Sequence, residues 1–191
     1  MTPHKRSPRR GARIFLWTPN FWLLTKGANI YKVPLQASGV LAITPRPRGG
    51  DWLLGDIQRL AAQGVQILVS LLTAEEEAEL QLENEASLCT SSGIEFIVFP
   101  IPDRGVPPES RPFVRIIGRL ASAVRNGKSV AVHCRQGVGR SGLLVAAVVM
   151  ALGESSEAAF DTVSAARGVR IPETPEQRDW LRQNFVKLGY T

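Results

Sequence analysis

The residues with the clearest capacity for chemistry lie close together in the segment HCRQGVGRSG, at positions 133–142. The run SVAVH before it predicts a strand, and the long apolar run after it predicts a buried helix. Cys134 is therefore expected where a strand ends, among backbone N–H groups at the positive end of a helix. Such sites lower a thiol pKa from about 8.5 to roughly 3.5–7.5, which makes the sulfur a nucleophile at neutral pH.

The other residues of this segment are suited to holding a tetrahedral oxyanion. Gly137 and Gly139 let the loop turn its amides inward. Arg140 can present two donors to two phosphoryl oxygens. Ser141 is close enough in sequence to donate its hydroxyl toward the sulfur, and His133 is expected to orient the loop through hydrogen bonds. The segment therefore predicts phosphoryl transfer to a cysteine.

This pattern resembles the HCxxGxxR[ST] signature of the cysteine-dependent protein tyrosine phosphatase superfamily, in its compact dual-specificity form. The resemblance covers most of residues 30–188 and implies a phosphatase fold with a Cys-x5-Arg loop, a phosphocysteine intermediate and no cofactor or metal. It also implies an aspartic general acid on a separate loop, and Asp103 in FPIPDRGVP fits. The catalytic residues are then Cys134, Arg140, Asp103, Ser141 and His133, and the substrate-binding residues are Arg135, Gln136, Gly137, Val138, Gly139, Arg140 and Gln177.

Several of these assignments have simpler competitors. Asp103 lies in PDRG, a good turn, where an aspartate commonly bonds its own backbone. Gln177 either positions the attacking water or only closes a capping box with Thr174. His133 is also consistent with a core histidine, and Arg135 with a residue that faces solvent. These alternatives stay open at this point.

The elements around the segment alternate between strands and helices, which predicts one α/β domain with a central, mostly parallel sheet flanked by helices. Four prolines interrupt the segment that carries Asp103, so it is expected to be a loop. The expected strands span 40–44, 65–70, 94–99 and 129–133, and the expected helices span 51–63, 110–126, 141–152 and 156–166, with a last one opening at 174.

Two local predictions concern the first half of the domain. Asp51 is expected to cap the first helix, with Trp52 facing the core. Thr73 and Glu76 form a capping box at the start of an acidic helical stretch. The other acids of that stretch are expected on a solvated surface; they are Glu75, Glu77, Glu79, Glu83 and Glu85. Cys89 is expected to be a packed helix residue, with a redox partnership to Cys134 as the alternative.

Composition restricts the remaining possibilities. The 191 residues carry a net charge of +6, and a basic leader supplies most of that excess. We expect residues 1–29 to be a flexible extension and residues 30–191 to be the phosphatase domain. Nucleic-acid binding is disfavoured because the rest of the chain is nearly neutral, and membrane contact through the leader is a minor alternative. No apolar run is long enough for a membrane span, so we expect a soluble protein. Residues 14–24 lack the continuous apolar region of a signal peptide, so we expect a cytoplasmic location, and we expect a monomer.

The leading hypothesis is a protein phosphatase that acts on phosphotyrosine, with phosphoserine and phosphothreonine as further substrates. The first alternative is a phosphatase for phosphoinositides or other non-protein phosphate monoesters, although Arg135 is the one extra charge in the loop. The second is a phosphoprotein-binding module that has lost catalysis. Because Cys134, Arg140, Ser141 and Asp103 are all present, the usual sequence mark of that loss is missing.

Overall fold

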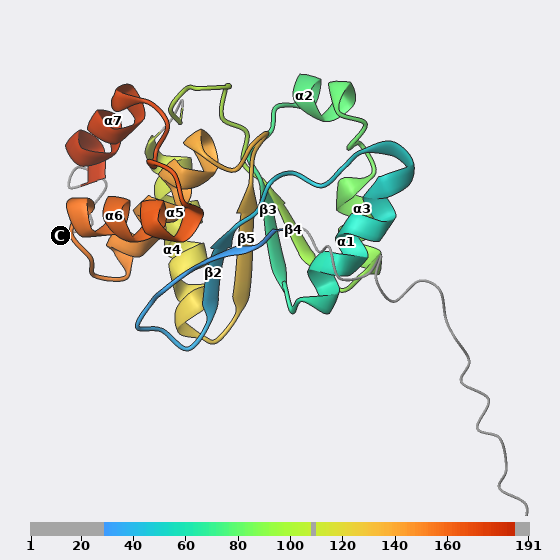
Figure 1. Cartoon of the computed structure of the whole chain (residues 1–191), viewed down its shortest axis with the longest axis horizontal. Helices are drawn as coiled ribbons and strands as arrows, with labels where there is room; N and C mark the ends of the chain where they lie inside the picture. Colours follow the sequence, from blue (N-terminus) through green and yellow to red (C-terminus); the bar gives the residue numbers. More distant parts are fainter. Residues whose placement is uncertain (1–28, 108–109, 186–191) are drawn as a thin grey trace, which may run out of the picture.

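The computed structural model describes residues 29–107 and 110–185, which form a five-stranded sheet covered by helices on both faces (Figure 1). The strand order is β1-β2-β5-β3-β4. The strands are β1 (Tyr31–Val33), β2 (Val40–Ile43), β3 (Ile67–Ser70), β4 (Glu95–Val98) and β5 (Ser129–His133). All neighbours pair in parallel except β1, which runs antiparallel to β2 at the edge. The predicted mostly parallel α/β fold is confirmed.

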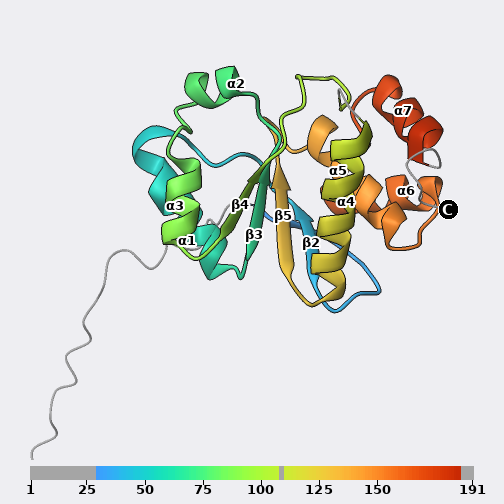
Figure 2. The same cartoon turned by 180° about the vertical axis from the view of Figure 1, so that it is seen from behind.

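Seven α-helices and one 3-10 turn complete the described part of the chain. They are η1 (Gly50–Trp52), α1 (Leu53–Ala62), α2 (Ala74–Glu79), α3 (Glu85–Ser91), α4 (Ser110–Arg125), α5 (Gly139–Ala151), α6 (Ser156–Arg167) and α7 (Pro175–Phe185). The view from behind shows α4, α5, α6 and α7 on one side of the sheet and α1 and α3 on the other (Figure 2). The predicted extension 1–29 lies outside the described residues except for residue 29.

Alternation along the strands divides the core between the two faces of the sheet. Val69 and Val132 pack against α4 and α5, whereas Leu68 and Ala131 pack under α1 and α3. Helix α5 is apolar all round because it is buried in the larger of these two clusters. The central strand β5 is buried on both faces, and its carboxyl end lies in the middle of the sheet edge.

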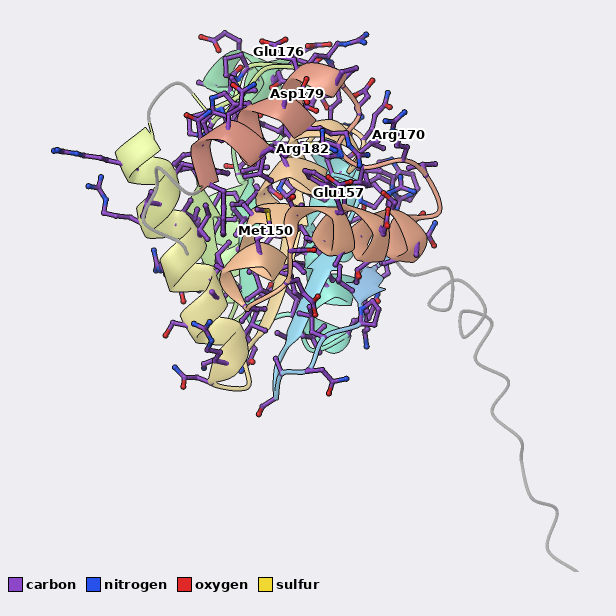
Figure 3. All side chains as sticks on the ribbon, turned by 90° about the vertical axis from the view of Figure 1, so that its left-hand side faces the viewer. Met150, Glu157, Arg170, Glu176, Asp179 and Arg182 are labelled. Atoms are coloured by element: carbon purple, nitrogen blue, oxygen red, sulfur yellow. The ribbon has the colours of Figure 1, made fainter. Side chains whose placement is uncertain are left out.

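Helix ends follow the chemistry expected of them in most places. Thr73 and Glu76 form the predicted capping box at the start of α2. Thr174 and Gln177 form a second one before α7. On the far side of the domain, Arg182 of α7 lies 2.7 Å from Glu157 of α6, and Figure 3 shows both side chains on the outer surface. This exposed ion pair links the two helices that flank the loop 168–174.

Three predictions about the first half of the domain are wrong. Asp51 makes no capping hydrogen bond, because the chain turns through η1 before α1 begins at Leu53. Trp52 is 62% exposed, and its ring stacks under Arg48, with 4.6 Å between the guanidinium carbon and the ring centroid. The acidic stretch forms two short helices, α2 and α3, and Glu85 is buried rather than solvated.

Candidate active site

The four parallel strands end at one edge of the sheet, and the segments that follow three of them meet there. Cys134 follows β5 directly and is 4% exposed. Residues 134–140, called the phosphate loop below, run from the end of β5 into the first turn of α5, which begins at Gly139. Gly137 has a φ of 67°, and a Cβ there would lie 2.9 Å from the Thr44 carbonyl oxygen. A glycine is therefore required for the loop to pack against the end of β2.

The surroundings of Cys134 lower the pKa of its thiol below the ordinary value. Burial acts in the opposite direction, but hydrogen bonds from the Ser141 hydroxyl and backbone and the positive charge of Arg140 outweigh it. The buried Ser141 oxygen makes no hydrogen bond to another described oxygen or nitrogen, so its proton is available to the sulfur. The predicted nucleophile is thus favoured in its reactive thiolate form.

A first prediction concerns the pH at which Cys134 ionises. The rate of alkylation by iodoacetate should follow a titration whose midpoint lies below the free-thiol value of about 8.5. In Ser141→Ala the midpoint should rise, because the thiolate loses a hydrogen-bond donor, and the alkylation rate at pH 6 should fall about tenfold. The rate constant should be measured across the pH range for both proteins. Identical profiles would contradict the role of Ser141.

Arg140 is almost fully buried and is held rigidly by a carboxylate that the sequence analysis had not assigned to the site. Its Nη1 lies 2.6 Å from Glu76 Oε2, and its Nη2 lies 2.8 Å from Glu76 Oε1. Nη1 also donates to the Ile101 carbonyl oxygen at 2.9 Å. The hydrogen bonds from Arg140 lower the pKa of the Glu76 carboxyl. This bidentate pair fixes the plane of the guanidinium beside Cys134.

Asp103 lies in the loop after β4 and reaches across to the phosphate loop. Its Oδ1 is 2.9 Å from Arg140 Nη2, and its side chain is 59% exposed. Behind it, the Gln177 amide donates to the Gly105 carbonyl oxygen at 2.9 Å and thereby fastens this loop to α7. The structure therefore brings Asp103 to Arg140 and buries Gln177 beside them.

His133 is fully buried and has an acidic neighbour on α3. Its Nε2 lies 3.1 Å from Glu85 Oε1, an ion pair without hydrogen-bond alignment. Burial opposes the charge on the imidazole, but the negative charges of Glu85 and Cys134 raise the pKa of His133 overall. A protonated imidazole beside Cys134 also favours the thiolate. His133 is thus a buried histidine, and neither of its ring nitrogens makes one of the loop-orienting hydrogen bonds that the sequence had led us to expect among the described residues.

Arg167, at the end of α6, supports the phosphate loop from outside. It donates to the Gly137 carbonyl oxygen at 2.9 Å and to the Gln136 carbonyl oxygen at 3.1 Å. Its guanidinium carbon lies 4.1 Å from the centroid of the Tyr31 ring on β1. These contacts direct the two carbonyls of the loop toward Arg167.

The centre of these contacts is a small polar pocket of about 160 Å³. It is lined by Asp103, Arg104, Cys134, Arg135, Gln136, Gly139, Arg140 and Glu173. Arg135 leans outward to an ion pair with Glu79. Among the residues that the structure describes, no three His, Cys, Asp or Glu side chains are placed to bind a metal ion together. None of the described helices combines the length and apolar character that crossing a membrane requires.

Comparison with known proteins identifies this arrangement. Residues 45–154 match the family model described as Tc-R-P, polymorphic toxin system, DSP-PTPase phosphatase. The chain belongs to this DSP-PTPase family. Cyclin-dependent kinase inhibitor 3 of Rattus norvegicus is 29% identical over 136 residues, which are 70% of this chain and 64% of that protein. The match thus spans less than two thirds of the relative's length.

Solved structures give the same fold for this DSP-PTPase domain. A kinase associated phosphatase with its catalytic cysteine substituted by serine superposes with a TM-score of 0.80 at 24% identity, over 87% of this chain and 99% of that one. The active form of Tk-PTP gives a TM-score of 0.64 at 26% identity, over 77% and 92% of the two chains. The recognition of a compact dual-specificity phosphatase from the signature is therefore confirmed.

Cys89, the second cysteine of the DSP-PTPase domain, lies on α3 and belongs to the other core cluster. Burial and the charge of Glu85 raise the pKa of its thiol to about 12. It is therefore unreactive at neutral pH, as expected of a packed helix residue.

Proposed function

We propose that this domain is a protein phosphatase that hydrolyses phosphotyrosine, and also phosphoserine and phosphothreonine, through a phosphocysteine intermediate. The observation that carries the proposal is the convergence of three groups on one pocket. They are the thiolate-favouring site of Cys134, the guanidinium of Arg140 held by Glu76, and the carboxyl of Asp103 beside that guanidinium. Together these are a nucleophile, an anion clamp and a proton donor.

The reaction follows from these positions. A phosphoryl group that enters the pocket replaces Asp103 on Arg140, and the loop amides take up its remaining oxygens. Cys134 Sγ attacks phosphorus in line, and Asp103 donates a proton to the departing oxygen as the P–O bond breaks. Water then attacks the phosphocysteine, Asp103 accepts a proton, and the S–P electron pair returns to the sulfur.

The pocket rim supports substrates of both kinds. None of the described residues that line it is aromatic, so no ring wall is present to select a phenyl group. The ring of phosphotyrosine and the short side chain of phosphothreonine both leave the reacting phosphorus within reach of Cys134. Phosphopeptide assays should show turnover of both, and strict phosphotyrosine preference would remove the dual-specificity assignment.

A second prediction tests the general acid. Asp103→Ala should lower the maximal rate by about 100-fold on phenyl phosphate and far less on p-nitrophenyl phosphate, because only the poor leaving group requires protonation. The rates on both esters should be compared with those of Arg104→Ala, a neighbouring change that leaves the carboxyl in place. Equal losses of maximal rate on the two esters would contradict the assignment of Asp103 as the general acid.

Phosphoinositides are the main alternative substrates. The rim carries Arg104 and Arg135, but Glu79 pairs with Arg135 and Glu173 adds a negative charge, so little positive charge remains for additional phosphates. Hydrolysis of phosphoinositide vesicles should therefore be weak. Vesicle binding by a variant that lacks residues 1–13 tests the basic leader separately. Unchanged affinity would show that the leader does not contribute to membrane binding.

The remaining features of the proposal are the domain limits 30–191, a cytoplasmic location and a monomeric state. The domain limits rest on the position of the basic leader in the sequence. The competing idea of an inactive phosphoprotein-binding module predicts phosphopeptide affinity without turnover. Hydrolysis of p-nitrophenyl phosphate in the presence of a chelator distinguishes these two functions.

A further inference from the structure

Glu85 is a buried carboxylate to which the reaction above gives no task. It is the first residue of α3, which lies on the side of the sheet opposite α4 and α5 (Figure 2). The residue is 1% exposed, and neither of its carboxylate oxygens forms a hydrogen bond with any residue that the structure describes. A buried carboxylate without hydrogen bonds is costly unless another charge compensates it. The neighbouring charge therefore decides what Glu85 does.

The group that faces Glu85 is the imidazole of His133, at the end of β5. Its Nε2 lies 3.1 Å from Glu85 Oε1, and both side chains are almost completely buried. The two ring nitrogens also lack hydrogen-bond partners among the described residues. Two neutral side chains would leave all four of these buried atoms without compensation, whereas a carboxylate beside an imidazolium gains the attraction of opposite charges at close range. The pair is therefore expected to be ionised.

The other ionisable groups around this pair are acids and thiols. Glu77 on α2 interacts electrostatically with both members of the pair, and one of its oxygens is buried without a hydrogen bond. Cys89 lies one turn further along α3, and its thiol stays neutral because its pKa is raised to about 12. Cys134 is next to His133 in the chain. Burial opposes the charge on the imidazole, but the negative charges of Glu85 and Cys134 raise the pKa of His133 overall.

We infer that Glu85 is a positioning residue for the nucleophile: its carboxylate keeps His133 protonated, and the imidazolium charge stabilises the Cys134 thiolate. The inference rests on the proposed function, in which that thiolate attacks phosphorus. The coupling is reciprocal, because a thiolate that favours the imidazolium is itself favoured by it to the same extent. Glu85 does not line the catalytic pocket, so it acts on the reaction through His133 rather than by contact with the phosphoryl group.

Removal of the Glu85 charge can act on Cys134 in two opposite ways. Through direct repulsion a carboxylate disfavours a thiolate, so the loss of this repulsion would lower the pH at which Cys134 ionises. If Glu85 acts through His133, its removal leaves the imidazole neutral and raises that pH. In Glu85→Gln the midpoint of the iodoacetate titration should therefore rise by at least about half a pH unit, and alkylation at pH 6 should slow at least about threefold. The acidic limb of kcat/KM for p-nitrophenyl phosphate should move in the same direction.

Two further variants control the alkylation experiment. Glu85→Leu fills the same space with apolar atoms, so it should raise the midpoint as Glu85→Gln does. Its Tm should not fall, because a neutral His133 no longer requires a buried partner charge. Glu83→Gln removes a negative charge from an exposed position two residues away and should leave the alkylation profile unchanged.

NMR titration of the imidazole measures the protonation of His133 directly. The chain has two histidines, so His4→Gln identifies the signal of His133. In the wild type this imidazole should be protonated at pH 7, and in Glu85→Gln it should be neutral at the same pH. A neutral His133 in the wild type, or a midpoint that is unchanged or lowered in both Glu85 variants, would overturn the inference. Alkylation and NMR require no turnover, whereas wild-type protein without turnover would refute the proposed function, so the two failures are distinguishable.

Discussion

Cys134→Ser is expected to reduce turnover of p-nitrophenyl phosphate by at least about ten-thousandfold while the affinity for inorganic phosphate is retained. The hydroxyl is not ionised at neutral pH, so it cannot use the surroundings that lower the pKa of the thiol. The amides of the phosphate loop and Arg140 remain in place and continue to bind the anion. Steady-state kinetics gives the first quantity, and calorimetric titration with phosphate gives the second.

Cys89→Ala is the appropriate control for this experiment. Its thiol is buried, has a pKa raised to about 12 and lies in the core cluster under α1 and α3. The variant should keep full activity and the same sensitivity to iodoacetate as the wild type. A loss in Cys134→Ser well short of about ten-thousandfold, or inactivation of Cys89→Ala, would contradict the cysteine mechanism.

The second large effect is expected at Glu76. In Glu76→Ala the Arg140 guanidinium loses both carboxylate bonds that fix its plane, so kcat should fall by about 100-fold. Glu76→Gln keeps the shape and one acceptor and should lose less. The comparison variant is Glu75→Ala, which changes an exposed acid on the same turn of α2. Equal kcat values for the alanine variants at 75 and 76 would refute the role of Glu76.

The ion pair between Glu76 and Arg140 also makes the stability of the fold depend on pH. The pKa of Glu76 is lowered in the folded protein, chiefly by its hydrogen bonds from Arg140. The ion pair therefore stabilises the fold at pH values above the unfolded carboxyl pKa of about 4.3, and this contribution is lost as the pH falls through the lower folded value. The difference in Tm between wild type and Glu76→Gln should shrink on acidification.

The sequence predicted the parts of the site that are local in the chain. Cys134, Arg140 and Ser141 share one loop, and the proline-rich composition around Asp103 marked a second loop. The alternation of strands and helices predicted the parallel sheet, and the structure shows that both loops follow strands at the same edge of it. Glu76 was predicted to be a capping residue, and the structure confirms this. The capping pattern in the sequence gave no sign that Glu76 also contacts Arg140.

The supporting residues were missed because their roles depend on tertiary packing. Glu85 lies in a run of acids that is typical of a solvated helix, and it is buried only because α3 packs against the sheet beside His133. Arg167 precedes a helix-ending glycine and resembles any basic residue in a last turn. Trp52 was wrongly placed in the core because η1 shifts the start of α1 and turns the ring outward.

The stacking of Arg167 on Tyr31 sets a practical boundary for anyone who shortens this protein. Tyr31 contributes nothing to the pocket lining, yet it belongs to the support that directs the Gln136 and Gly137 carbonyls toward Arg167. Removal of the basic leader alone leaves that support intact. A fragment that starts after β1, such as one trimmed to the matched residues 45–154, would carry the whole signature and lack both stacking partners. We therefore expect the minimal active unit to be larger than the motif-bearing segment.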